Sequence, residues 1–296
     1  MTLLLRNGTI HSVGDPFATA VLIDRGTIAW IGQESTADTL AAETVVDLDG
    51  LLLTPAFADA WAPAGEGAVP PGVVAAQVAA PATLAAPGLE VTEIAAVHVR
   101  EAGALGAALE RASAGPVAGG PPRLHLPGSL TLTDGDVEAI VRAHAVVVTA
   151  AADGGFALPL ARLVAEGVLV AFGSGGRDWH DPWSTITAAV STGPAPLTAR
   201  AAFNAHSRQV WRLGPPAAIP RGTIAVGSPA SVAGWAVEAL AVQTPDERVA
   251  SWSTDPRAGT PLLPALGPDE VRPVHAFTLA AGEVVAWDES ILPRPA

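Results

Sequence analysis

The order of strands and helices is clearest in one central stretch, Arg123–Phe172, which reads RLHLPGSLTLTDGDVEAIVRAHAVVVTAAADGGFALPLARLVAEGVLVAF. Apolar runs of strand length alternate here with longer stretches of helical periodicity. Thr133 stands where a helix N-cap is expected, and Gly167 stands where a helix should end. We predict, in chain order, a strand, a helix, a strand, a helix and a strand: Arg123–Leu126, Asp136–His144, Ala145–Ala151, Leu158–Glu166 and Val168–Phe172. Such alternation is typical of a parallel sheet with right-handed crossovers.

The alternation continues on both sides of this stretch. We expect strands at Phe57–Ala60 and Ile94–Val99, and one more at Val73–Ala79 inside the otherwise loop-like segment Pro63–Pro87. Further helices are expected at Ala102–Ala112, Trp183–Ser191 and Thr198–Leu213. Residues 56–221 are fewer than the roughly 200 to 250 that a complete eight-fold barrel needs. The sequence therefore predicts an α/β fold with a shortened or incomplete TIM-like (β/α) barrel of six or eight strands.

Both ends of the chain have a β character. Short strands separated by turn residues are predicted at Leu3–Leu5, Thr9–His11, Ala20–Asp24, Thr27–Ile31, Thr44–Leu48 and Leu51–Thr54, with a helix at Ala37–Ala42. The C-terminal part repeats the pattern at Gly222–Ile224, Ala230–Ala236, Val274–Ala280 and Val284–Trp287. Each end is too small to bury a core alone. We expect the ends to form one small β-sandwich domain, which gives a division into 1–55, 56–221 and 222–296.

Composition excludes several kinds of chemistry. All 16 basic residues are Arg, and the chain has no Cys and no Tyr. This excludes a P-loop lysine, a Schiff-base lysine, a metal-bridging lysine, a cysteine nucleophile and a cysteine zinc site. The net charge of −13 argues against nucleic acid and anionic membranes as partners. The apolar runs are shorter than a membrane span and the first residues look like a strand rather than a signal peptide, so we expect a cytoplasmic protein.

Several segments, in this order, resemble the amidohydrolase superfamily, in particular the branch called amidohydrolase 3. They are LLLRNGTIHSV (Leu3–Val13), VVDLDGLLLTPAFADAW (Val45–Trp61), AAVHVREAGALGAALE (Ala95–Glu110), GVLVAFGSGG (Gly167–Gly176), DPWSTITAAVSTG (Asp181–Gly193) and the closing RGTIAVGSPASVAGW and AFTLAAGEVVAW. The resemblance implies a metal-dependent hydrolase of non-peptide C–N bonds. In such enzymes the metal is held at the C-terminal ends of the barrel strands and lowers the pKa of a bound water.

The chain departs from the family at its metal ligands. The His-x-His pair of the first strand is replaced by Trp61-Ala62-Pro63, and neither an indole nor a pyrrolidine ring offers a lone pair to a cation. Gly175 stands where the family has an Asp after the last strand. His125 lies one residue away from the usual ligand position, which predicts the opposite face of its strand. We therefore expect no metal cofactor.

Six residues are expected to line the former active-site mouth: Asp59, Trp61, His98, Ser174, Asp178 and His180. His98 falls where the family has a strand-borne His, and the alternative is a histidine satisfied within a barrel strand. Asp59 alternatively hydrogen-bonds loop backbone, and Trp61 fills the space that the metal left. Asp178 and His180 alternatively belong to a solvated loop in which Asp181 caps a helix starting at Pro182.

Three functions follow from these residues. The first is a catalytically impaired amidohydrolase-like protein, a pseudoenzyme that retains small-molecule binding. The alternative is an active hydrolase of amide-like C–N bonds, with zinc or another divalent metal in a reduced site around His98, Asp178 and His180. The third is a structural or oligomer-forming subunit, such as a homo-oligomer. The candidate catalytic residues are His98, Asp178 and His180.

Overall fold

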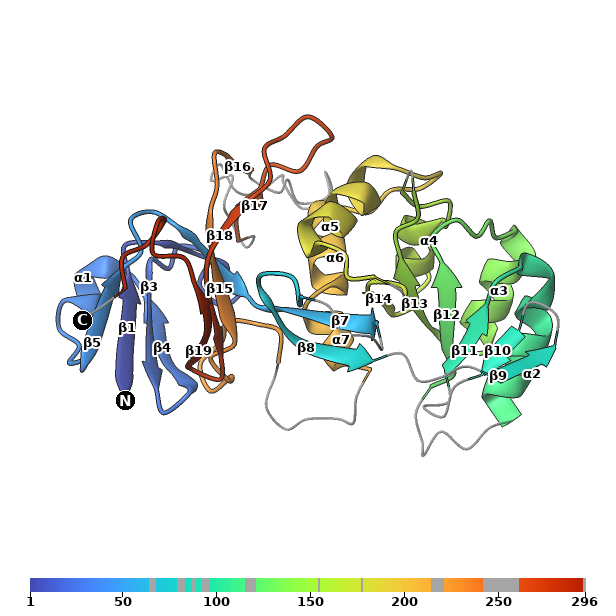
Figure 1. The fold of residues 1–296 in the computed structure, drawn as a ribbon, viewed down its shortest axis with the longest axis horizontal. Helices are drawn as coiled ribbons and strands as arrows, with labels where there is room; N and C mark the ends of the chain where they lie inside the picture. The colour runs from blue at the N-terminus through green and yellow to red at the C-terminus, as the bar shows by residue number, and fades with distance from the viewer. Residues whose placement is uncertain are drawn as a thin grey trace, which may run out of the picture. The chain divides into compact units, whose positions relative to one another are not determined.

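The computed structural model describes residues 1–63, 68–78, 83–86, 89–91, 96–114, 121–153, 155–176, 178–213, 221–241 and 261–294. The chain forms two compact units: Met1–Phe57, Pro71–Val74 and Pro216–Ala296 make up unit 1, and Ala58–Pro70 with Ala75–Pro215 make up unit 2. Unit 1 is mainly β and unit 2 alternates strands with helices (Figure 1). Within the described residues, no helix has the length and apolarity to cross a membrane.

Two sheets build unit 1. The first has the order β4-β3-β1-β5, from Thr27–Gly32, Ala20–Asp24, Thr2–Arg6 and Thr44–Asp47. The second has the order β19-β18-β15-β6-β2, from Glu283–Trp287, Val274–Ala280, Val232–Ala236, Leu52–Pro55 and Thr9–Ile10. Strand β15 pairs with both β6 and β18, so the two ends of the chain share one sheet.

One hydrophobic core holds these two sheets together. Leu3, Leu5, Val21 and Ile23 from the first sheet and Leu53, Val232 and Phe277 from the second belong to a single buried cluster. A small ladder of β16 (Leu240–Ala241) and β17 (Leu263–Pro264) lies outside both sheets. The packing of two sheets over one core explains why neither end of the chain is a domain by itself.

Two local predictions in unit 1 were wrong. The helix expected at Ala37–Ala42 is the short α1, Glu34–Ala37, which ends where that prediction began. The Thr39 hydroxyl donates to the Thr36 carbonyl, and such local bonds compete with helix continuation. The strand expected at Gly222–Ile224 is instead irregular, although Ile224 itself is buried in the unit 1 core.

The main sheet of unit 2 contains the predicted parallel strands. Its order is β14-β13-β12-β11-β10-β9, from Val170–Phe172, Val146–Ala150, Arg123–Pro127, Ala96–Val99, Leu89–Val91 and Thr83–Ala86. Strands β11 to β14 run parallel, whereas β10 is antiparallel to β9 and β11. The antiparallel pair was not predicted, because an Ala-rich and Pro-rich segment is more typical of a loop. Figure 1 shows the six strands side by side.

Helices follow the parallel strands as predicted, with shifted ends. They are α2 (Leu105–Ala114, preceded by the 3-10 turn Ala102–Ala104), α3 (Asp134–Arg142), α4 (Leu160–Ala165), α5 (Pro182–Ser191), α6 (Ala199–Ala205) and α7 (Arg208–Trp211). A capping box between Thr133 and Asp136 starts α3. The single helix predicted over Thr198–Leu213 is divided, because Ser207 leaves the helical conformation at φ −125° and ψ −96°.

A separate two-stranded ladder joins β7 (Phe57–Ala62) to β8 (Val73–Val78). The loop after β14 connects this ladder to the main sheet, because Gly173 N donates to the Thr149 carbonyl and Gly176 N donates to the Trp61 carbonyl at 2.9 Å. A Cβ atom on Gly173 would lie 2.3 Å from Trp61 N, so only glycine permits this approach. The loop after β14 therefore lies directly against the end of β7.

Candidate functional site

Strand register places two histidines on one face of the sheet in unit 2. His98 in β11 is paired with His125 in β12, His125 with Val148 in β13, and Val148 with Ala171 in β14. Paired positions in a parallel ladder point to the same side. We call this surface, defined by these four residues, the histidine face. The prediction that His125 points to the opposite side was therefore wrong, because facing is set by the pairing between strands and not by position counted along one strand.

Trp61, at the end of β7, closes over these two histidines. Its ring centre lies 5.0 Å from that of His98, edge-on, and 4.7 Å from that of His125. The two imidazoles stack with centres 4.7 Å apart and planes inclined by 19°. All three side chains are buried. We call this cluster of Trp61, His98 and His125 the aromatic triangle; it brings together two of the predicted site residues and one that had been discounted.

Burial dominates the electrostatics of the aromatic triangle. Burial lowers the pKa of His125 well below its usual value of 6.5, and electrostatic repulsion from His98 and Arg123 lowers this pKa further. Neither ring nitrogen of His125 has a hydrogen-bond partner among the described residues. Arg123 donates to the Leu213 carbonyl at 2.6 Å, and burial also lowers the pKa of its guanidinium. His125 is therefore a neutral imidazole at pH 7.

Asp59 joins β7 to the loop after β14. Its Oδ1 accepts hydrogen bonds from Trp61 N at 2.8 Å and Ser174 N at 3.1 Å, and its Oδ2 accepts one from Ser174 Oγ at 2.5 Å. Ser174 Oγ in turn accepts a bond from His180 N at 2.9 Å. Asp59 and Ser174 are both buried. The carboxylate thus satisfies three donors and fixes Trp61 against the loop; the Ser174 hydroxyl is engaged on both sides and is not set up as a nucleophile.

His206, at the end of α6, was not among the predicted site residues. It is fully buried, its Nδ1 lies 3.0 Å from the Ala58 carbonyl oxygen, and its ring contacts Phe172 edge-on. Because a carbonyl only accepts, Nδ1 carries the proton in this bond. Burial lowers the pKa of His206, while the nearby Asp59 carboxylate and the Ala58 carbonyl oppose that shift. A histidine within the helical segment NAHS offered little sign of this position in the sequence.

The rim residues after β14 are not gathered onto the histidine face as ligands. Asp178 is exposed and His180 is half-buried. Asp181 caps α5, accepting from Trp183 N at 3.4 Å and Ser184 N at 3.0 Å. Across the described ranges, no three His, Asp or Glu side chains lie close enough together to hold a metal ion. The group His98, Asp178 and His180 is thus not assembled as a metal site in the structure.

The pair of imidazoles also has an unsuitable orientation for shared coordination. The lone pair of an imidazole nitrogen lies in the plane of its ring, so two ligands of one ion need ring planes that meet at that ion. His98 and His125 are inclined by only 19°. Trp61 is the third ring of the aromatic triangle, but its indole offers no lone pair to a metal ion. The side chains present on the histidine face therefore do not fit the metal centre that the sequence resemblance implies.

Three of the solved structures that this chain resembles are described as enzymes. An atrazine chlorohydrolase from Arthrobacter aurescens TC1 in complex with zinc is 12% identical and has a TM-score of 0.58, covering 97% of this chain and 96% of that chain. An adenosine deaminase from Xanthomonas campestris with bound zinc is 13% identical, with a TM-score of 0.57 and coverage of 95% and 92%. An enamidase, described as a member of the amidohydrolase superfamily, is 15% identical, with a TM-score of 0.46 and coverage of 97% and 96%.

The chain therefore shares the fold of the atrazine chlorohydrolase and of the adenosine deaminase over nearly its whole length, at low sequence identity. This likeness agrees with the resemblance seen in the sequence at the level of the fold, a mixed α/β architecture. No protein-family model matches the sequence, and no curated protein is significantly similar to it.

Proposed function

We propose that this chain is a catalytically impaired amidohydrolase-like protein, in which the fold is kept and the metal-dependent hydrolysis of C–N bonds is lost. The observation that most directly supports this is the position of Trp61, whose indole contacts both His98 and His125. An aromatic side chain without a lone pair thus occupies the side of the histidines where a further ligand and the attacking water would be needed.

In this proposal, unit 2 is a shortened (β/α) barrel. The domains of the whole chain follow the division expected from the sequence, into residues 1–55, 56–221 and 222–296. Trp61 of β7 contacts β11 and β12, although β13 and β14 lie between those strands and the loop after β14 that binds β7. This contact supports a strong curvature of the main sheet. Small-molecule binding at the rim near Asp178 and His180 is the part of the ancestral function that such a protein would keep. A cytoplasmic location and the lack of nucleic-acid and membrane partners remain predictions.

The test combines metal content with hydrolysis. The protein is purified from zinc-, iron- or manganese-supplemented medium, metal is measured per chain by mass spectrometry, and turnover of amide-like C–N substrates is measured on the same sample. We expect a metal content far below one ion per chain and no turnover above that of a His98→Ala sample. Near-stoichiometric metal that is lost together with activity in His98→Ala would contradict the proposal.

One observation favours the alternative of an active hydrolase with a reduced site. His125 adds a second imidazole beside His98, so the histidine face carries two nitrogen donors instead of the one expected from the sequence. If that alternative holds, His98→Ala and His125→Ala should each remove both metal and activity. The variants Asp178→Ala and His180→Ala then test whether the rim takes part in metal binding and activity. Both residues are remote from the stacked pair in sequence, and neither is fully buried.

A further inference from the structure

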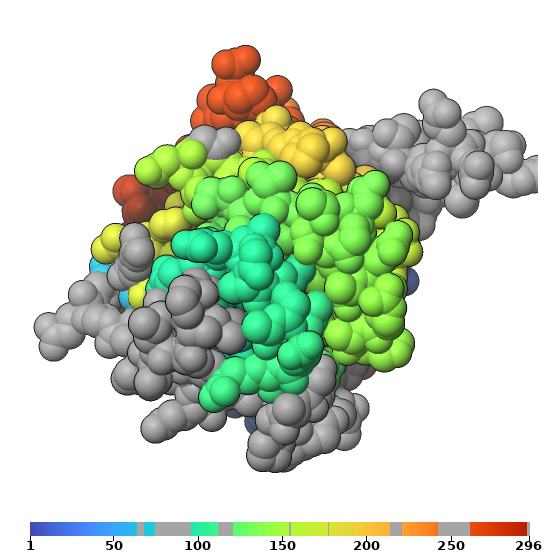
Figure 2. Space-filling view, turned by 90° about the vertical axis from the view of Figure 1, so that its right-hand side faces the viewer, coloured from blue at the N-terminus to red at the C-terminus, as the bar shows by residue number. Residues whose placement is uncertain are grey.

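A charged groove lies between α3 and α4 on unit 2, away from the histidine face. It has a volume of about 400 Å³ and is lined by Val137, Glu138, Val141 and Arg142 from α3 and by Arg162 and Glu166 from α4 and its C-terminal end. Val137 is buried and Val141 is half-buried, whereas Glu138, Arg142 and Glu166 are exposed. The groove thus has an apolar floor and a charged rim, which is the anatomy of a protein interface. Figure 2 looks onto the side of the molecule that carries α2 and α3.

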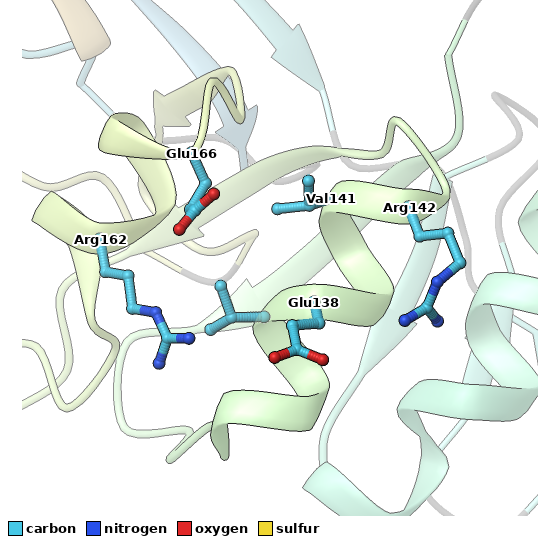
Figure 3. Close-up of a pocket in the computed structure, with 6 residues that line it drawn as sticks. Glu138, Val141, Arg142, Arg162 and Glu166 are labelled. Carbon is cyan, nitrogen blue, oxygen red and sulfur yellow. The ribbon is translucent and has the colours of Figure 1, made fainter.

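The four charges alternate in sign around the groove. Glu138 and Arg142 lie four residues apart on α3, and Arg162 and Glu166 lie four apart in the opposite order (Figure 3). Strands β12, β13 and β14 are parallel, so the two crossover helices between them run in the same direction. Arg142 and Glu166 therefore lie at the C-terminal end of the groove, and Glu138 and Arg162 lie one turn earlier.

These charges are available to a partner. Arg162 forms an ion pair with Asp134, but Glu138, Arg142 and Glu166 take part in no ion pair within the part of the chain that the structure describes. A two-fold axis running along the groove would set α3 of one copy over α4 of the other at the same height. Arg142 then faces Glu166 of the second copy, and Glu138 faces Arg162, each pair occurring twice.

From this pattern we propose that the groove between α3 and α4 binds a second copy of the same chain, forming a two-fold dimer. The surface is complementary to itself in this one orientation, whereas a generic acidic or basic partner would meet equal numbers of like and unlike charges. Exposed ion pairs contribute little energy individually, so the dimer is weak and salt-sensitive. Such a dimer does not depend on whether the histidine face binds a metal.

The test is sedimentation of the full chain over a range of protein and salt concentrations. The parent chain should form dimers that dissociate as salt rises. Arg142→Glu alone and Glu166→Arg alone should each weaken the dimer by at least about tenfold, because every changed side chain occurs twice in a two-fold interface. An equimolar mixture of the two variants should dimerise again, since each copy then offers the charge that the other lacks. Arg294→Glu, an exposed change in unit 1, should leave dimerisation unchanged.

Restoration in the mixture distinguishes this interface from general damage, which mixing would not repair. A parent chain that stays monomeric at every concentration would overturn the proposal, and so would a dimer that neither single variant weakens. If a mixture of Arg142→Glu with Glu138→Arg dimerises, whereas a mixture of Arg142→Glu with Glu166→Arg does not, then the proposed two-fold axis along the groove is wrong. Circular dichroism and thermal unfolding of each variant should match the parent, because all three side chains are exposed.

Discussion

His98 and His125 are register partners on adjacent parallel strands, and their rings stack with centres 4.7 Å apart. The third ring of the cluster, Trp61, completes a triangle with sides of 4.7, 4.7 and 5.0 Å. In a tetrahedral site with zinc–nitrogen bonds of about 2.0 Å, imidazole ring centres lie roughly 5 Å apart. The aromatic triangle therefore has the spacing of a three-histidine site, with an indole in one of the three places and the two imidazoles turned away from a common centre.

Trp61→His should consequently create zinc binding. A third imidazole completes the usual set of three protein ligands, and removal of the larger indole gives His98 and His125 room to turn. We expect zinc affinity at least about tenfold tighter than that of the parent chain, measured by calorimetric titration at pH 7.5. Trp61→Phe is the matched control, since it opens similar space without adding a donor; equal zinc binding by both variants would show that the spacing is irrelevant.

Replacing His125 by Phe should not destabilise the protein. Its two ring nitrogens are buried and have no hydrogen-bond partner in the described structure, so the imidazole carries an uncompensated desolvation cost. Phe keeps an aromatic ring against Trp61 and His98 and removes that cost. We expect a change in the free energy of unfolding between zero and about 2 kcal/mol of stabilisation, from urea denaturation. A clear loss of stability would reveal a partner or ligand for the nitrogens.

Asp59→Ala should destabilise the protein strongly. The change leaves Trp61 N, Ser174 N and Ser174 Oγ without their acceptor in a buried region. We expect a loss of about 2 to 4 kcal/mol in urea unfolding, because unsatisfied buried donors are costly. Ser174→Ala removes only the hydroxyl and should cost about 1 kcal/mol. Similar losses for both variants would contradict a central role of the carboxylate.

Stability should fall in mild acid because of the buried histidines. Burial lowers the folded-state pKa of His125 and of His206 below the unfolded value of 6.5. Below pH 6.5 the unfolded chain therefore binds more protons than the folded chain, and stability decreases as pH falls toward the folded-state values. The slope is at most about 1.4 kcal/mol per pH unit for each histidine.

Comparison of the parent and His125→Phe isolates the part of this slope due to one group. Urea unfolding at pH 7.5, 6.5 and 5.5 should give a shallower decline for the variant. Identical pH profiles would mean that His125 is not held neutral by its surroundings.

Much of the fold could be predicted from the sequence because the signals are local. The alternation in Arg123–Phe172, the Thr133 cap and Gly167 correctly indicated β12, α3, β13, α4 and β14. Local signals failed where a contact elsewhere in the chain decided the outcome. Strand β9 forms in a segment expected to be mostly loop, β10 follows it where no strand was predicted, and Ser207 divides one predicted helix into α6 and α7.

The sequence by itself determined which side chains could not hold a metal, because the donor chemistry of Trp61, Pro63 and Gly175 does not depend on the fold. It did not determine where the donors that remain would lie. Only the pairing of β11 with β12 brought His125 beside His98, and only the return of α6 to β7 buried His206 against Ala58. The physical reason is that the type of a side chain is a local property, while register and long-range packing depend on the total energy of all the contacts.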